Sequence, residues 1–290
     1  MMGPKRHHPL IPLVFLLPAC SLVGALVIYP ALQALWLSFT NFNMITPSHW
    51  VGADNYRRLA ADPFFWSALR NSLLYLVVVV PVLVFVPIVI AVLVNRAIPG
   101  VRLFRALFYL PVVTSLVISS LIWKWVYEEK GLLNYLLLKT GLVANPVAFL
   151  TDPANALLAV MAVTVWSGIG YYMVIYLAGL QAIPRHLYEV ADVEGVTPLQ
   201  QFLHITLPLL RPSMAVVAVM SSIAAMKVFE EIYVMTQGGP MDASKTLVYF
   251  IYETAFSEFE MGLASAAGMV LFAITLVLSL INLRLLRRKV

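Results

Sequence analysis

Four charged residues fall within apolar stretches of the sequence, where an ionised side chain is costly and usually faces a cavity or a partner. Lys227, Glu230 and Glu231 lie near the end of one such stretch, and Lys124 lies in another. On a continuous helix Lys227 and Glu231 would share a face and could form an ion pair, because they are four positions apart. These residues predict either the polar lining of a translocation path or a structural pair near the membrane interface.

Aromatic side chains near these charges could stack against the apolar face of a sugar ring, or could belong to packing and interfacial belts. The candidates for contact with a transported molecule are Tyr171, Tyr172, Tyr176, Phe229 and Tyr233. The histidines do not share the spacing of a metal site, and no catalytic triad or pair of catalytic carboxylates stands out. We therefore expect no catalytic residue, no metal and no cofactor bound by this chain.

The composition indicates a membrane protein. Of the 290 residues, 61% are hydrophobic and 11% are charged, whereas a soluble domain carries about 25% charged residues. A membrane-spanning helix needs roughly 20 apolar residues, and runs of this length predict six transmembrane helices at about 10–37, 71–95, 104–126, 155–180, 212–236 and 262–286. We expect an all-α, polytopic membrane protein with a single transmembrane domain over residues 1–290. The first run is longer than a signal-peptide core, so we expect it to be retained.

Basic residues predict the orientation, because short cytoplasmic loops are enriched in Lys and Arg. With the N-terminus inside, the inner segments hold most of the basic residues, namely Lys5, Arg6, Arg96, Arg102, Arg105, Arg185, Arg211, Arg284, Arg287, Arg288 and Lys289. The expected outer loops hold most of the acids. Both termini are therefore expected to be cytoplasmic.

One loop on the expected inner side, residues 184–212, also carries acids. Glu189 and Asp192 are three positions apart and would share one face of a short helix. Gly195 would allow a sharp bend, and Thr197 with Pro198 suits the start of a second short helix. Such a compact knob could dock into a groove on another protein or lie on the lipid surface. The acids favour docking, because the inner leaflet is itself anionic.

The same loop closely resembles the EAA signature of ABC importer permeases. Glu189-Val190-Ala191, then Gly195, then Ile205-Thr206-Leu207-Pro208 reproduces the family spacing of E-A-A, three residues, G, nine residues, I, one residue, L-P. Val190 departs from the usual alanine, which is a mild change at an apolar position. The resemblance implies an ABC importer type I permease fold, in which this loop is a cytoplasmic coupling loop. It implies an ATPase-docking surface formed by Glu189, Val190, Ala191, Glu194, Gly195 and Val196.

Other strings resemble the maltose-type and glycerol-phosphate-type permeases. Among them are Asn71-Ser72-Leu73, the run Gly179 to Pro184, and the run Phe229 to Pro240. This resemblance implies translocation of a mono-, di- or oligosaccharide, or of a sugar-like polyol phosphate, across the inner membrane. It also implies three kinds of partner, which are a second homologous permease subunit, a cytosolic ATPase dimer and an extracytoplasmic sugar-binding protein.

The energy source is expected to lie outside this chain. The sequence has no G-x-x-x-x-G-K-[ST] loop to hold phosphates, so ATP and Mg are expected on the partner ATPase subunits. We expect a non-catalytic subunit of a bacterial or archaeal cytoplasmic membrane. The alternative is an ion-coupled secondary transporter that uses Lys227, Glu230 and Glu231. Transporters of that kind usually have more spans and inverted repeats, which argues against it.

Overall fold

The computed structural model describes residues 10–95 and 99–287, and the regular structure of these residues is helical apart from one isolated antiparallel bridge between Thr40 and Trp50. The helices are α1 (Leu10–Val23), a π-helical turn η1 (Gly24–Ile28), α2 (Tyr29–Leu37), α3 (Asp54–Ala61), α4 (Pro63–Val94), α5 (Val101–Val113), α6 (Leu116–Val126), α7 (Leu132–Lys139), α8 (Ala156–Gln181), α9 (His186–Val193), α10 (Pro198–Gln201), a second π-helical turn η2 (Phe202–Thr206), α11 (Leu207–Leu209), α12 (Arg211–Met226), α13 (Glu230–Met235), α14 (Leu247–Phe256) and α15 (Met261–Arg287). Of the basic residues that predict the orientation, Lys5, Arg6, Arg96, Arg288 and Lys289 lie outside the described residues. The all-α prediction is confirmed.

Five helical segments are long and apolar enough to cross a bilayer: Phe15–Leu37, Pro63–Val94, Ala156–Gln181, Arg211–Met235 and Met261–Asn282. A sixth span exists if α5 and α6, which meet at an angle of 100°, are counted together. Helix α4, which contains most of the second predicted span at about 71–95, begins eight residues before that span, at Pro63. Asp62 caps this start by accepting a hydrogen bond from the Phe64 amide at 2.8 Å, and Pro63 is at home in the first helical turn.

The third predicted span, at about 104–126, is divided by a sharp bend between α5 and α6. The helix ends at Val113, and Thr114 adopts an extended backbone with ψ of 144°. Pro111 lacks the N–H that would continue the helical hydrogen bonding. The Thr114 hydroxyl donates to the carbonyl of Pro111 at 2.8 Å, which gives a partner to one of the free carbonyls at the end of α5.

The chain forms two compact units, and the expectation of a single transmembrane domain stays a prediction. The first unit comprises the chain up to Ala61 and residues Ile251–Val270. In it the Asn55 amide donates to the carbonyls of Ser38 at 2.9 Å and Thr40 at 2.8 Å, and Arg58 pairs with Glu260 at 2.5 Å. The apolar side chains of Phe15–Leu37 are not buried within the chain, so lipid or another protein must cover them.

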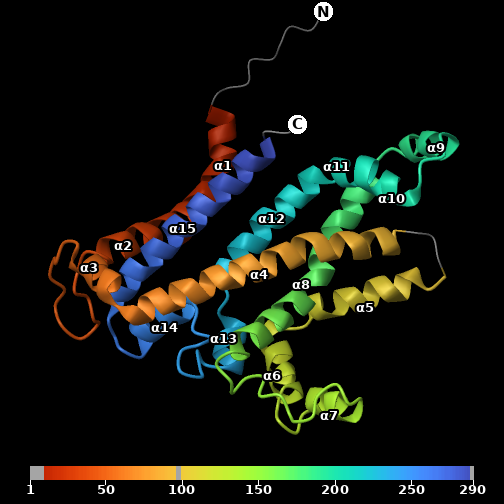
Figure 1. Ribbon diagram of the computed structural model, residues 1–290. Coiled ribbons are helices and arrows are strands. Elements are labelled where there is room, and N and C mark those ends of the chain that lie inside the picture. The colour runs from red at the N-terminus through yellow and green to blue at the C-terminus, as the bar shows by residue number, and fades with distance from the viewer. Residues whose placement is uncertain (1–9, 96–98, 288–290) are drawn as a thin grey trace, which may run out of the picture. The chain divides into compact units, whose positions relative to one another are not determined.

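The second unit, residues 62–250 and 271–290, contains the main hydrophobic core. Helix α4 packs against both α8 and α12, and Figure 1 shows α8 crossing α4 within this unit. Tyr75 and Met173 are fully buried in this core. Pro81 and Pro87 lie within α4, which stays helical through both, and the Tyr176 hydroxyl donates to the nearby Val84 carbonyl at 2.9 Å.

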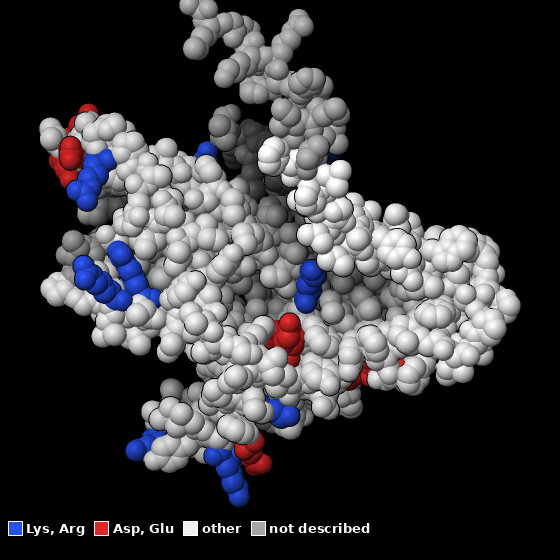
Figure 2. Space-filling model, turned by 180° about the vertical axis from the view of Figure 1, so that it is seen from behind, with Lys and Arg blue, Asp and Glu red and all other residues white. Residues whose placement is uncertain are grey.

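The charged side chains on the surface lie in a few groups, separated by wide uncharged areas (Figure 2). A lipid-facing surface requires such uncharged areas, because charged side chains are costly inside a membrane.

Helices α5 and α8 approach each other closely at Gly170. A Cβ atom added there would lie 2.0 Å from the carbonyl oxygen of Phe108, well inside van der Waals contact. We expect Gly170→Ala to destabilise the protein by about 1–3 kcal/mol, because the backbone of one helix must shift. The measurement is the thermal unfolding midpoint of the purified protein in detergent. Gly268→Ala is the matched control, since nothing lies within 4 Å of its added Cβ. Equal midpoints for the two variants would contradict the close approach.

Candidate functional sites

A cavity of about 580 Å³ lies between α4, α8, α12 and α13 in the second unit. We call it the polar cavity because hydrogen-bonding side chains contribute to its otherwise apolar wall. Val79 and Leu83 of α4 and Tyr172 of α8 form apolar and aromatic parts of its wall. The polar side chains that line it are Thr164, Ser167, Ser221, Lys227, Glu230 and Glu231. Its volume falls within the range of about 300–1,000 Å³ that is typical of small-molecule sites. The cavity thus combines a mostly apolar wall with a few hydrogen-bonding groups.

The helix that spans this region breaks at the cavity. Helix α12 ends at Met226, and α13 begins at Glu230. Between them Lys227 has φ −105° and ψ 13°, and Phe229 has φ −142° and ψ −55°. Lys227 and Glu231, which could pair on a continuous helix, form no salt bridge with each other in the described part of the chain. The four-residue spacing brings side chains together only on a continuous helix.

Glu231 has a hydroxyl partner instead of a cationic one. Its side chain is buried, with 3% of the residue exposed, and its Oε1 accepts a hydrogen bond from the Thr164 hydroxyl at 2.7 Å. Because that bond uses the single hydroxyl hydrogen of Thr164, the buried Tyr75 hydroxyl donates in turn to Thr164 Oγ1. Sequence reasoning missed Tyr75 and Thr164. No local pattern could have identified them, since both are far from Glu231 along the chain.

The other predicted path residues separate into two groups. Tyr172, Lys227, Glu230 and Glu231 line the polar cavity, whereas Tyr171, Tyr176, Phe229 and Tyr233 do not. Tyr176 is fully buried in the core, and Tyr171 packs edge-on against Tyr172 with ring centroids 5.3 Å apart. Phe229 and Tyr233 stack at 5.4 Å beside Tyr249. The structure therefore brings the three predicted charges to one cavity and most of the predicted aromatics to packing positions.

The 184–212 loop folds as the two predicted short helices with a bend between them, at one end of α8 and α12 (Figure 1). Gly195 lies in the left-handed region with φ +74°, which confirms the need for glycine at the bend. Thr197 caps α10, with Pro198 in its first turn, as predicted. The cap is reciprocal, since the Thr197 hydroxyl accepts from the Gln200 amide while the Gln200 side chain accepts from the Thr197 N–H.

Side-chain hydrogen bonds hold the two helices of this loop together. The Gln201 side-chain amide donates to Asp192 Oδ1 at 2.6 Å and to the Val196 carbonyl at 3.2 Å. Farther along, the hydroxyls of Tyr188 and Thr206 are 2.9 Å apart and hydrogen-bonded. These contacts join α9 to α10 and to η2, which leads through α11 into α12. The loop is therefore braced internally at two points.

The predicted docking residues occupy different surfaces of the loop. Val190, Ala191, Glu194 and Val196 surround a groove of about 420 Å³, whereas Glu189 and Gly195 do not line it. Glu189 is exposed, and Val193 is the most exposed apolar residue of α9 at 89%. Ala191 is only 6% exposed, so its methyl group faces the interior of the loop.

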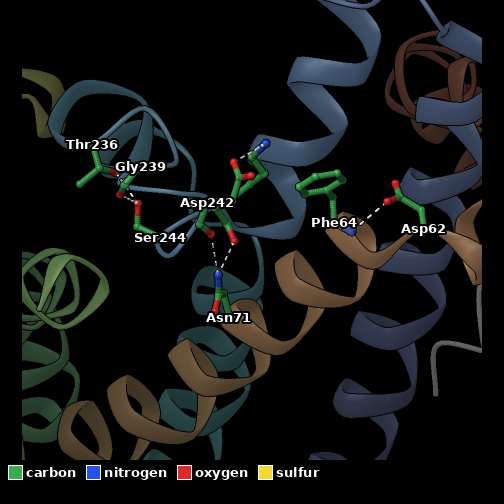
Figure 3. A network of polar contacts seen from close by, with 8 residues as sticks. Asp62, Phe64, Asn71, Thr236, Gly239, Asp242 and Ser244 are labelled. Carbon is green, nitrogen blue, oxygen red and sulfur yellow. Dashed lines mark hydrogen bonds and ion pairs between the residues drawn. The ribbon is translucent and has the colours of Figure 1, made fainter. Parts of the chain in front are cut away.

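The 236–246 segment is tied to the start of α4, as Figure 3 shows. The Asn71 side-chain amide donates to the carbonyls of Asp242 at 3.3 Å and Lys245 at 3.0 Å. The Ser244 hydroxyl lies 2.6 Å from the Gly239 carbonyl and 2.7 Å from the Thr236 hydroxyl. Lys245 forms an ion pair with Asp242 at 2.7 Å. Asn71 and Gly239 belong to two of the sequence stretches that resemble the maltose-type permeases. Both residues are thus parts of one hydrogen-bonded structure.

Lys124, the fourth predicted intramembrane charge, lies apart from the polar cavity. Its ammonium group donates to the Val234 carbonyl in α13 at 3.4 Å. It also lines a second cavity, of about 650 Å³, together with Glu128, Glu129 and the Gly239–Pro240 turn. Among the described residues, no cluster of three or more His, Cys, Asp or Glu side chains could hold a metal ion.

Known proteins are similar to this chain in sequence and in fold over almost its whole length. A probable ABC transporter permease protein of Bacillus subtilis, YurN, is 38% identical over 96% of this chain and 97% of its own length. The lactose transport system permease protein LacF of Rhizobium radiobacter is 35% identical over 87% of this chain and 85% of its own length. A crystal structure of a bacterial ABC transporter involved in the import of the acidic polysaccharide alginate contains a chain that matches with a TM-score of 0.81 and 26% identity, over 96% of this chain and 95% of that chain.

The family model for binding-protein-dependent transport system inner membrane components matches residues 59–290. This range includes the polar cavity, the helix break and the 184–212 loop. The chain belongs to the family of binding-protein-dependent transport system inner membrane components.

Proposed function

We propose that this chain is a permease subunit that translocates a sugar across the membrane through the polar cavity. The observation that carries the proposal is the broken α12–α13 helix beside a cavity with hydroxyl, carboxylate and ammonium groups. Unwound backbone at membrane depth is tolerated only where it is buried in protein or lines a cavity. Relatives named for the transport of lactose and alginate support a carbohydrate as the transported molecule.

We further propose that the energy comes from partner subunits through the 184–212 loop. The loop would dock on a cytosolic ATPase dimer that binds ATP and Mg, with Glu189 as the ion-pair partner of an ATPase arginine. A second permease would complete the path, and an extracytoplasmic binding protein would deliver the sugar. Both termini would then be cytoplasmic. Docking is supported by the exposed Glu189, Val190 and Val193 and by the groove next to them.

The proposed coupling is mechanical. When the ATPase subunits close on ATP, the 184–212 loop would move with them and displace α12, which carries one wall of the polar cavity. The internal bracing by Asp192–Gln201 and Tyr188–Thr206 supports this, because a braced loop transmits a displacement as a rigid body. The ion-coupled alternative has no support in the family that the chain matches.

Energy dependence tests the proposed function directly. In proteoliposomes that contain all subunits and the binding protein, we expect sugar uptake to require ATP hydrolysis and to persist in a proton uncoupler. An ATPase subunit without its catalytic carboxylate should reduce uptake to background. Uptake that continues with the inactive ATPase but stops with the uncoupler would contradict the proposal in favour of ion coupling.

The bend at Gly195 tests the docking surface. We expect Gly195→Val to reduce co-purification of the ATPase subunit strongly, because a β-branched residue at φ +74° costs about 1–3 kcal/mol and displaces α9 from α10. The measurement is the amount of ATPase retained per permease after affinity purification. Gly195→Asn is the matched control and should retain more ATPase, since asparagine tolerates the left-handed region. Retention at the wild-type level by the valine variant would exclude the bend from docking.

The Asp192–Gln201 hydrogen bond tests mechanical coupling separately from docking. We expect Gln201→Ala to leave the ATPase bound but to lower the sugar transported per ATP hydrolysed by about tenfold, an order-of-magnitude expectation for losing a hydrogen bond to a charged group. The measurement is parallel uptake and phosphate release in proteoliposomes. Asp192→Asn keeps an acceptor oxygen and should stay close to wild type. A normal transport ratio in Gln201→Ala would remove this bond from the coupling.

A further inference from the structure

The charged side chains that line the polar cavity indicate whether the transported sugar is neutral or anionic. This inference rests on the proposed function as a sugar permease. Two carboxylates, Glu230 and Glu231, line it against one ammonium group, that of Lys227. None of its lining residues is an arginine, the side chain best suited to holding a carboxylate or phosphate in two parallel hydrogen bonds. Among the described residues, no salt bridge joins Lys227 to either acid. The charged side chains of the lining are therefore net acidic.

Glu231 is the fixed member of this acidic pair. It is 3% exposed although it lines the cavity, and the Thr164 hydroxyl of α8, which is itself hydrogen-bonded to the Tyr75 hydroxyl of α4, donates to it. Glu230, in contrast, is exposed and has no such bracing in the described part of the chain. An intramembrane carboxylate without a cationic partner is costly and usually marks a functional site. Held by a neutral donor, Glu231 keeps acceptor capacity for hydroxyls of a molecule in the cavity.

We propose that Glu231 is a specificity-determining residue through which this subunit accepts neutral, hydroxyl-rich saccharides and rejects anionic ones such as uronates or sugar phosphates. A sugar hydroxyl can donate to a carboxylate in a short, charge-assisted hydrogen bond. An anionic substituent in its place would be repelled by the like charge of the carboxylate. Lactose and the acidic polysaccharide alginate are the transported molecules named for two of the relatives. We therefore expect this chain to transport a neutral saccharide, as lactose is, and not an acidic one such as alginate.

Ligand binding to the assembled transporter tests this inference without the selectivity of a binding protein. The sample is the complete permease–ATPase complex in nanodiscs, and the measurement is saturation-transfer NMR, which detects weak binding. The probes are neutral trisaccharides of glucose, galactose and mannose, each paired with the uronate trisaccharide of the same linkage. For wild type we expect at least one neutral trisaccharide to bind about tenfold more tightly than its uronate counterpart, an order-of-magnitude expectation for one like-charge contact near a surface.

Three variants assign the preference to the Glu231 charge. Glu231→Gln should abolish the difference between the neutral and uronate probes, because it keeps the shape but loses the charge. Glu231→Asp should keep a preference for the neutral probe, and Glu258→Gln, an exposed acid outside the cavity, should behave as wild type. A wild type that binds the uronate as tightly, or an unchanged preference in Glu231→Gln, would overturn the inference. Loss of the preference only in Lys227→Gln would overturn it as well.

Failure of the proposed function would look different. In that case no probe of either set would bind, and proteoliposomes with ATP and the binding protein would take up none of them. Binding and ATP-driven uptake of uronates at the rate of neutral sugars would instead leave the permease function intact and remove only the role of Glu231. The yield and basal ATPase activity of each complex show that the variants are folded and assembled.

Discussion

A backbone carbonyl that loses its helical partner inside an apolar environment must find another donor, and the second unit is arranged around this constraint. At the end of α4, the Arg105 guanidinium donates to the Val94 carbonyl at 2.5 and 3.1 Å. At the α5–α6 break, the Thr114 hydroxyl donates to the Pro111 carbonyl. At the α12–α13 break, the Thr246 hydroxyl donates to the Val228 carbonyl at 3.2 Å. Each of these departures from continuous helix has a side chain assigned to it, and two of the three donors are threonines.

This requirement explains which parts of the fold could be predicted from the sequence. The apolar runs predict the spans because length and hydropathy alone decide whether a helix can cross a bilayer. The bend and cap of the 184–212 loop could be predicted because Gly195, Thr197 and Pro198 act locally on their own backbone. The positions of the α5–α6 and α12–α13 breaks could not, although Pro111 within the third predicted span favours a kink there. They depend on Thr114 and Thr246, whose sequence positions do not indicate that their hydroxyls will meet a free carbonyl.

The candidate sites were predictable to different degrees for the same reason. Lys227, Glu230 and Glu231 stood out because charge is rare in an apolar run, and the structure brings all three to one cavity. Lys227 and Glu231 do not pair, because the break between α12 and α13 removes the continuous helix on which their spacing would bring them together. The aromatic candidates had no such distinguishing property, and Tyr176 belongs to the core. Tyr75 and Thr164 complete the surroundings of Glu231 through contacts between α4, α8 and α13 that only the tertiary structure reveals.

The internal bracing of the 184–212 loop also affects the entropy of association. A segment that is disordered before binding must lose conformational freedom when it docks, and this loss weakens the affinity that its contacts could provide. Here the Asp192–Gln201 bond, the Tyr188–Thr206 bond and the Thr197 capping box order the loop within a single chain. Association with a partner would then leave most of the interaction free energy available as affinity. The same loop could keep its shape through repeated cycles of attachment and release.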